Sequence, residues 1–266
     1  MIDLFNPTSI KHFFYDIYKI LKETDKDVVE VWSEVSEFVG LEQLNKYELT
    51  DFLNNFEFLT QEKGNYNKEY IAINKIKFIL QSITHLDFDL KSLSELLNFS
   101  GFETLISEIL IKNNYTVIKN FRFSDKSNFK SKTKQKRYEV DVIGIKGGII
   151  LLIDGKQWKH RDVFSSMNKA ANLQYQRVLA LEKNPEKFSH LIFQLLGSSP
   201  NIKKFLPFKL IPIMVTLENN GIKSNDNQVP LISILEFNSF LQEFQSNLDY
   251  VKIIKISKVN VQSKLF

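Results

Sequence analysis

The feature that most constrains the fold is the run "EVDVIGIKGGIILLIDGKQW" at residues 139–158, in which two apolar segments flank Gly147 and Gly148. Adjacent glycines suit the positive φ angles that a two-residue β-hairpin loop requires. We therefore expect an antiparallel hairpin whose strands cover residues 137–145 and 149–156. The two strands are almost wholly apolar, and the few carboxylates inside them need a physical reason to be there.

Pairing across this loop would bring four polar side chains together. Counting outward from the glycines places Asp141 opposite Asp154 and Glu139 opposite Lys156. Directly opposed side chains share one face of a sheet, with Cβ atoms roughly 4.5–5.5 Å apart. Two carboxylates at that separation repel each other unless a proton or a cation lies between them. The hairpin therefore predicts a polar cluster within an apolar sheet.

A hard divalent cation would relieve that repulsion. Mg²⁺ prefers oxygen ligands, and one or two carboxylates together with waters commonly hold it. We expect Asp141 and Asp154 to bind Mg²⁺ or Mn²⁺, which would activate a water and stabilise charge on a phosphate oxygen. Lys156 could bind the scissile phosphate or help to position and deprotonate the water. The alternative interpretation is a salt-bridge cluster at the solvated end of two strands.

The net charge of +4 hides two halves of opposite sign. Residues 1–100 carry a balance of −7 and residues 101–266 a balance of +11. The tract 122–137 contains seven Lys or Arg and one Asp, and it leads into the strand of Asp141. We expect it to contact the phosphates of a polyanion such as a nucleic acid, although a solvated connector is the other interpretation. The candidate nucleic-acid-binding residues are Lys130, Lys132, Lys134, Lys136, Arg137, Lys159 and Arg161.

We expect two domains, residues 1–90 and 91–266. In the first, apolar spacing predicts helices at residues 10–21, 28–39, 47–55 and 74–83. "FEFLTQEKGNYNKEYIAIN" predicts a hairpin around its turn-rich centre. Helices followed by a hairpin outline a winged helix, and a helical bundle is the other interpretation. The negative balance argues against broad phosphate contact, so we expect this mainly helical domain to mediate protein contact, dimerisation or autoinhibition.

The second domain has an α/β pattern. Besides the central hairpin we expect helices at residues 101–113, 164–183 and 238–246, and strands at 115–123, 211–217, 230–237 and 250–257. Gln174 is the one polar residue along the apolar stripe of the long helix. Pro212 suits the start or edge of a strand rather than its centre.

The segment "VDVIGIKGGIILLIDGK" resembles the motif of the PD-(D/E)XK nucleases, with Asp141 as the first acidic residue and "DGK", residues 154–156, as the second half. Upstream, "GFETLISEILIKNNYTVIKNFRF" is similar to the first helix and strand of Holliday-junction resolvases and Mrr-type restriction endonucleases. The resemblance covers about residues 99–160 and continues weakly beyond. Val140 stands where the motif has proline, and Asp154 where glutamate is common, which leaves the subfamily open.

This resemblance implies a restriction-endonuclease-like mixed sheet flanked by helices and Mg²⁺- or Mn²⁺-dependent hydrolysis of a DNA phosphodiester. It also implies a glutamate on the first helix that binds the metal or holds a metal-bound water. Glu103 matches that position, and Glu108 is the weaker candidate. We thus expect a metal-dependent DNA endonuclease with catalytic residues Glu103, Asp141, Asp154 and Lys156. Gln157, which could orient the attacking water, and Glu139 are secondary candidates.

The alternative is a non-catalytic DNA-binding or scaffold protein on a nuclease-like fold. A homodimer would suit the cutting of two strands, but no interface can be identified from the sequence. The chain has no cysteine, which excludes disulfides, thiolate zinc sites and thiol nucleophiles. It has no apolar run of about 18 residues and no signal-peptide pattern, so we expect no membrane span and a cytoplasmic, intracellular location.

Overall fold

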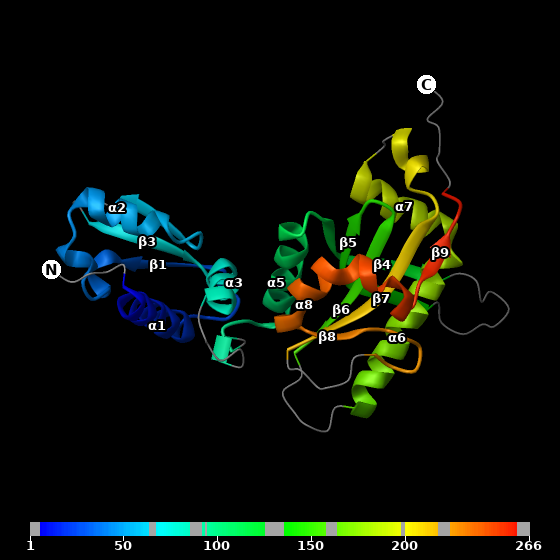
Figure 1. Ribbon diagram of the computed structural model, residues 1–266, viewed down its shortest axis with the longest axis horizontal. Coiled ribbons are helices and arrows are strands. Elements are labelled where there is room, and N and C mark those ends of the chain that lie inside the picture. The colour runs from blue at the N-terminus through cyan, green and yellow to red at the C-terminus, as the bar shows by residue number, and fades with distance from the viewer. Residues whose placement is uncertain are drawn as a thin grey trace. The chain divides into compact units, whose positions relative to one another are not determined.

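The computed structural model describes residues 6–63, 68–85, 92–93, 95–125, 136–157, 164–197, 200–217 and 224–259 (Figure 1). The chain divides into two compact units, Met1–Leu105 and Ile106–Phe266. The domain boundary expected between residues 90 and 91 falls within 86–91, which lies outside the described residues.

In its described residues, the N-terminal unit combines helices with a small antiparallel sheet in the order β1-β3-β2. Its elements are α1 (Pro7–Glu23), β1 (Glu30–Glu34), the 3₁₀ turns η1 (Val35–Glu37) and η2 (Leu41–Gln43), α2 (Lys46–Asn54), β2 (Leu59–Lys63), β3 (Glu69–Asn74) and α3 (Lys75–His85). The expected hairpin is confirmed, because β2 pairs with β3 from Leu59 opposite Ile73 to Lys63 opposite Glu69. Aromatic rings from α1, α2 and α3 and from the segments beside the strands fill the core of this unit.

The helix expected over residues 28–39 is wrong. Residues 30–34 form β1, in which Val31 and Ser33 are buried while Trp32 is exposed. Val31 pairs with Ile73 and Ser33 with Ile71 on β3. The apolar residues of this segment follow helical spacing. Strand alternation is hidden, because polar Ser33 is buried and apolar Trp32 is exposed. The choice is therefore made by pairing with a strand about forty residues further along the chain.

The C-terminal unit has mixed α/β architecture, as the sequence predicts. The division between the units falls within α5 (Phe99–Lys112), which leads into this unit. Then follow β4 (Thr116–Asp125), β5 (Lys136–Lys146), β6 (Ile149–Lys156), α6 (Phe164–Glu182), α7 (Pro185–Leu196), η4 (Pro200–Phe205), β7 (Phe208–Thr216), β8 (Leu231–Ser233), α8 (Ile234–Glu243), η5 (Phe244–Tyr250) and β9 (Ile254–Ile256). The strand order is β4-β5-β6-β7-β8, with β9 paired to β7.

The strand expected over residues 230–237 and the expected place of Pro212 differ from the structure. The strand expected over residues 230–237 ends at Ser233, whose hydroxyl accepts a hydrogen bond from the N–H of Glu236 and so caps α8. Pro212 lies inside β7 rather than at its start. On the side away from β6, β7 pairs with β9 at residues 208–210 and with β8 at 214–216, so Pro212 lies between the two ladders.

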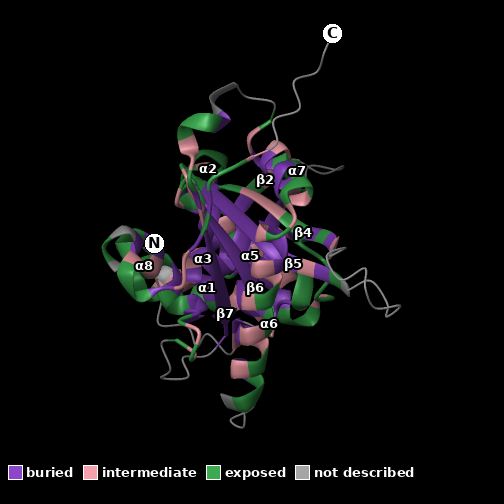
Figure 2. Ribbon diagram, turned by 90° about the vertical axis from the view of Figure 1, so that its right-hand side faces the viewer, coloured by how far each residue is buried: buried purple, intermediate pink, exposed green. Residues whose placement is uncertain are grey.

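Helices cover both faces of the central sheet. Strands β6 and β7 and the central part of β5 are mostly buried (Figure 2). On one face, β4 to β7 form a single hydrophobic cluster with α6 and α7, in which Val178 and Phe188 are fully buried. On the other face, a Cβ added at Gly144 would lie 3.0 Å from the side chain of Leu110 on α5. The sheet therefore has little exposed area near its centre.

The predicted loop and register of the central hairpin are confirmed. Lys146 lies opposite Ile149, and the ladder continues to Val142 opposite Ile153. Gly147 has a φ of +60°. Gly148 contacts the segment before β7 so closely that a Cβ there would lie 2.7 Å from the carbonyl oxygen of Phe205. Each glycine is thus required for a different reason.

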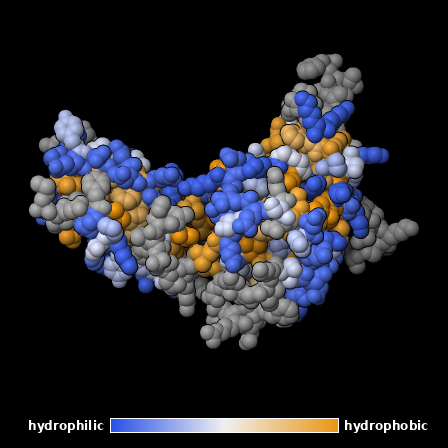
Figure 3. Space-filling view, viewed as in Figure 1, coloured by the Kyte–Doolittle hydropathy of each residue, from blue (hydrophilic) through white to orange (hydrophobic). Residues whose placement is uncertain are grey.

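Hydrophobic side chains form separate patches among hydrophilic ones on the face seen in Figure 3. Among the described residues, no helix has the length and apolar character needed to cross a membrane.

Gly148→Ala should destabilise the protein more than Gly147→Ala. The first substitution drives a methyl group into a backbone carbonyl, at a cost of about 2 kcal/mol or more. The second meets open space and costs about 1 kcal/mol for the left-handed conformation alone. Urea unfolding of both variants would measure the difference. Equal losses would mean that the approach of Phe205 is not a rigid contact.

Candidate active site

The candidate site lies where β6 ends. Asp154 pairs with Met214 on β7 and is almost completely buried, with 1% of its surface exposed. Lys156, two residues further on, pairs with Thr216 and keeps 23% of its side chain exposed. The site therefore has a buried carboxylate and a partly accessible ammonium on the same strand.

Strand β5 departs from regular geometry beside Asp154. Val140 and Ile143 both belong to the cluster that packs against α6 and α7. Residues three apart on a regular strand point to opposite faces, so the alternation shifts by one residue at Asp141 and Val142. The ladder with β6 also ends at Val142. We expected Asp141 to pair directly with Asp154. The regular ladder ends one residue pair before that position, at Val142 opposite Ile153.

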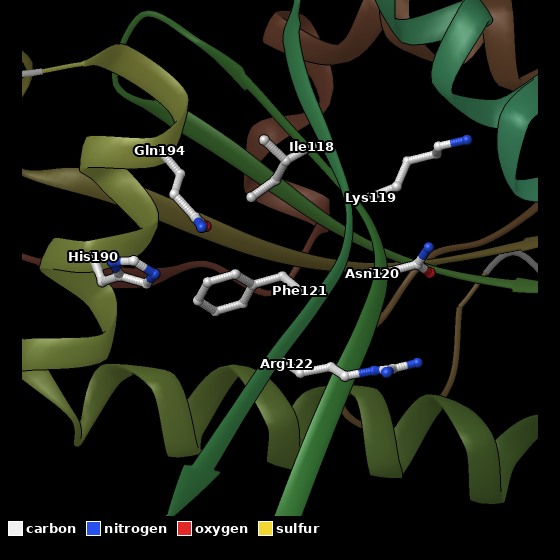
Figure 4. Close-up of a pocket in the computed structure, with 7 residues that line it drawn as sticks. All are labelled: Ile118, Lys119, Asn120, Phe121, Arg122, His190 and Gln194. Atoms are coloured by element: carbon white, nitrogen blue, oxygen red, sulfur yellow. The ribbon is translucent and has the colours of Figure 1, made fainter.

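The neighbouring strand has a matching irregularity. Asn120 on β4 has a φ of +56°, which is rare for a residue with a side chain. Ile118 and Phe121 point towards α7, whereas Lys119 and Arg122 point the other way (Figure 4). The register passes from Lys119 opposite Val142 to Phe121 opposite Val140, so the irregular positions of the two strands lie side by side. Such irregularities re-aim side chains and are frequent near active sites.

The carboxylate of Asp141, which lies beyond the regular ladder, points at the end of β6. Its Oδ2 accepts a hydrogen bond of 3.0 Å from the backbone N–H of Gly155, just past the ladder. Nζ of Lys156 lies 3.9 Å from the same oxygen and 3.1 Å from Oδ2 of Asp154. The structure therefore brings together Asp141, Asp154 and Lys156, as the sequence predicts.

Helix α6 adds a second cation that the sequence does not predict. Nη1 of Arg177 donates to Oδ1 of Asp154 at 2.6 Å and to Oε1 of Gln174 at 3.0 Å. Gln174 is fully buried and donates in turn to the carbonyl of Leu152 at 2.8 Å. The only sequence signal was the polar Gln174 within an apolar stripe, three residues before an arginine on the same helix face.

Cations thus approach both oxygens of Asp154. Oδ1 accepts the short charged hydrogen bond from Arg177, whose side chain is 14% exposed. Oδ2 is buried and accepts no hydrogen bond from the residues that the structure describes, since Lys156 approaches it as an ion pair without hydrogen-bond geometry. The two carboxylates and the two cations balance in formal charge.

Glu139 lies elsewhere. Its Oε1 is 2.8 Å from Nη2 of Arg122 across the β4–β5 pair. The hydrogen bond and charge of Glu139 raise the pKa of Arg122. The expected grouping of Glu139 with Lys156 is therefore replaced by an exposed cross-strand ion pair.

The remaining predicted residues are spread over the chain. Glu103 is buried on α5, and Gln157 is half-buried directly after β6. Arg137 is exposed on β5. The side chain of Lys136 and all of Lys130, Lys132, Lys134, Lys159 and Arg161 lie outside the described residues.

The donor set is compatible with a divalent metal ion. Asp154 presents a buried oxygen that accepts no hydrogen bond from its described neighbours, and carboxylate oxygens are what Mg²⁺ and Mn²⁺ prefer. Within the described ranges, no three or more His, Cys, Asp or Glu side chains form a metal-binding group. A metal here would rely on two aspartates, with waters or substrate oxygens completing its coordination. The role of Glu103 as a third ligand stays a prediction.

No family model and no curated protein match the chain. Among solved structures it is similar to protein VC1899 from Vibrio cholerae, with 14% sequence identity and a TM-score of 0.31. The match covers 91% of this chain and 52% of the other, so this chain spans about half the length of that protein. A TM-score of this size does not establish a common fold.

Gln174→Leu should destabilise the protein by about 1–3 kcal/mol, because it leaves the carbonyl of Leu152 without its donor and Arg177 without one acceptor. Gln176→Leu, at an exposed position of the same helix, is the matched control and should change stability by no more than about 0.5 kcal/mol. Thermal or urea unfolding would compare the two variants. Equal effects would show that the buried amide does not support the site.

Proposed function

We propose that this protein is a metal-dependent DNA endonuclease of the PD-(D/E)XK class, which hydrolyses phosphodiester bonds by in-line attack of water. The observation that carries the proposal is the convergence of Asp141 and Asp154 on the ammonium of Lys156, at 3.9 and 3.1 Å. The expected motif thus forms a three-dimensional cluster. A restriction-endonuclease-like fold is part of the proposal, and the mixed sheet with helices on both faces supports it.

The two aspartates would hold Mg²⁺ or Mn²⁺, with Glu103 as the third proposed ligand. When bound, the ion would stabilise negative charge on the phosphate and lower the pKa of a water. The irregularity of β5 points Asp141 at the end of β6, and the ion pairs and the strand pairing fix Asp154. The protein therefore supplies two oxygen donors from neighbouring strands.

Lys156 is suited to act on the substrate. Its side chain is partly exposed, so its ammonium could turn from the carboxylates to a non-bridging oxygen of the scissile phosphate. There it would offset the charge that develops during attack. Gln157, the next residue, would orient the attacking water.

DNA would approach across the β4–β5 hairpin. Arg137 is exposed at its outer end, next to the basic tract that joins the two strands. The positive balance of residues 101–266 supports a polyanionic partner. For the acidic N-terminal unit we propose a winged-helix module for protein contact or dimerisation, which the strand order β1-β3-β2 and the hairpin after α2 support.

Cleavage assays test the proposal. Labelled duplex, four-way junction, flap and single-stranded DNA, with single-stranded RNA alongside, would be incubated with Mg²⁺, Mn²⁺ or EDTA. We expect metal-dependent cutting of at least one DNA, reduced about 100-fold or more by Lys156→Gln and abolished by Asp154→Asn. Glu139→Gln is the matched control, because its carboxylate pairs with Arg122 outside the cluster.

Circular dichroism would confirm that each variant folds. Cutting by Asp154→Asn at the wild-type rate would refute the proposed site, and absence of cutting by the wild type on every substrate would refute the activity.

One observation favours a second candidate, a non-catalytic DNA-binding or scaffold protein. The pairing of Arg177 with Asp154 at 2.6 Å, together with Lys156, makes the cluster a charge-balanced structural unit without any metal. In that case the protein would bind DNA but would not cut it when metal is added. Asp154→Asn would also leave the DNA uncut.

Arg137→Ala should weaken DNA binding and lower the slope of log affinity against log salt concentration by about one unit. Lys77→Ala, an exposed lysine on α3 of the acidic unit, is the matched control and should leave the slope unchanged. Fluorescence anisotropy at several salt concentrations would measure both. The same slope in all three proteins would place the DNA away from this hairpin.

A further inference from the structure

Arg177 is held firmly against the candidate metal ligand. Its Nη1 is shared between Asp154 at 2.6 Å and the fully buried Gln174 at 3.0 Å, and Gln174 is anchored on the backbone of β6 through Leu152 at 2.8 Å. Helix α6 and strand β6 therefore fix the guanidinium from both sides. A surface arginine that met a carboxylate by chance would lack this support.

In this arrangement, each carboxylate oxygen of Asp154 has a cation beside it. Oδ1 accepts from Arg177, and the ammonium of Lys156 is 3.1 Å from Oδ2. A divalent ion bound to Asp154 would add two positive charges beside two existing ones. The repulsion would be strong, because the carboxylate is buried and charges interact more strongly away from water.

We propose that Arg177 is the counter-ion of the metal-free site: it neutralises Asp154 when no metal is present and competes with a divalent metal for that carboxylate. The inference rests on the proposed function in taking Asp154 as a metal ligand, and it adds how metal binding is restrained. The opposing role for Arg177 is to hold Asp154 in the orientation that the metal needs. The two roles predict opposite changes in metal affinity.

Manganese titration of the full chain separates them, with free Mn²⁺ counted by electron paramagnetic resonance. We expect Arg177→Met to bind Mn²⁺ about ten-fold more tightly than the wild type, because a buried competing charge is gone. Arg177→Lys keeps the charge and should stay within about three-fold of the wild type. Asp154→Asn gives the background, and Lys169→Met removes an exposed lysine from the same helix as the charge control.

A second readout is the melting temperature. Arg177→Met should melt lower than the wild type without metal, because Asp154 loses a partner. Mn²⁺ should then raise its melting temperature more than it raises that of the wild type. If Arg177→Met does not fold, Arg177→Gln takes its place, since a neutral amide can still donate a hydrogen bond to Asp154.

Tighter binding in the neutral variants and not in Lys169→Met would support the inference. Equal or weaker binding than the wild type would overturn it and leave the proposed nuclease function intact, since the metal site would still exist. Binding no stronger than the Asp154→Asn background in every variant would overturn both the inference and the metal site on which the proposed function depends.

Discussion

The buried carboxylate of Asp154 is the interaction on which the rest of the site depends. Only 1% of its surface is exposed, and Arg177 and Lys156 approach its two oxygens at 2.6 and 3.1 Å. A buried carboxylate without such partners would be costly. Loss of one partner of such a buried pair costs on the order of 3–5 kcal/mol. Two elements supply the cations that Asp154 needs. Strand β6 carries Lys156, and helix α6 carries Arg177, which Gln174 holds in place by a hydrogen bond.

The backbone prepares the site as much as the side chains do. A regular β5 would continue its alternation and its ladder past Asp141, whereas here both change at that residue. The left-handed Asn120 on the adjoining strand marks the same irregularity in β4. The carboxylate of Asp141 is thereby released to accept the N–H of Gly155 and to face Lys156. Sheet irregularity thus converts two separate aspartates into one cluster.

The sequence predicts the cluster well because a two-residue loop fixes strand register, and the ladder from Lys146–Ile149 to Val142–Ile153 follows that register. It does not predict Arg177, because the partner of a helical arginine depends on which strand the helix covers. It misassigns residues 28–39, because their apolar spacing fits a helix and only pairing with β3 selects a strand. It also misplaces Glu139, which pairs with Arg122 on β4 rather than with Lys156. The hairpin alone does not define where β4 lies.

A site whose charges balance without metal can belong to a metal-free enzyme or to a non-catalytic protein in which the cluster is structural. The position of a bound metal ion distinguishes the two. The most direct measurement is anomalous diffraction from crystals of the full chain soaked in Mn²⁺. A metal-dependent nuclease predicts an anomalous peak within about 2.0–2.6 Å of carboxylate oxygens from both Asp141 and Asp154, with Arg177 moved away from the latter. No peak between the two aspartates, with Arg177 and Lys156 still paired to Asp154, would contradict it.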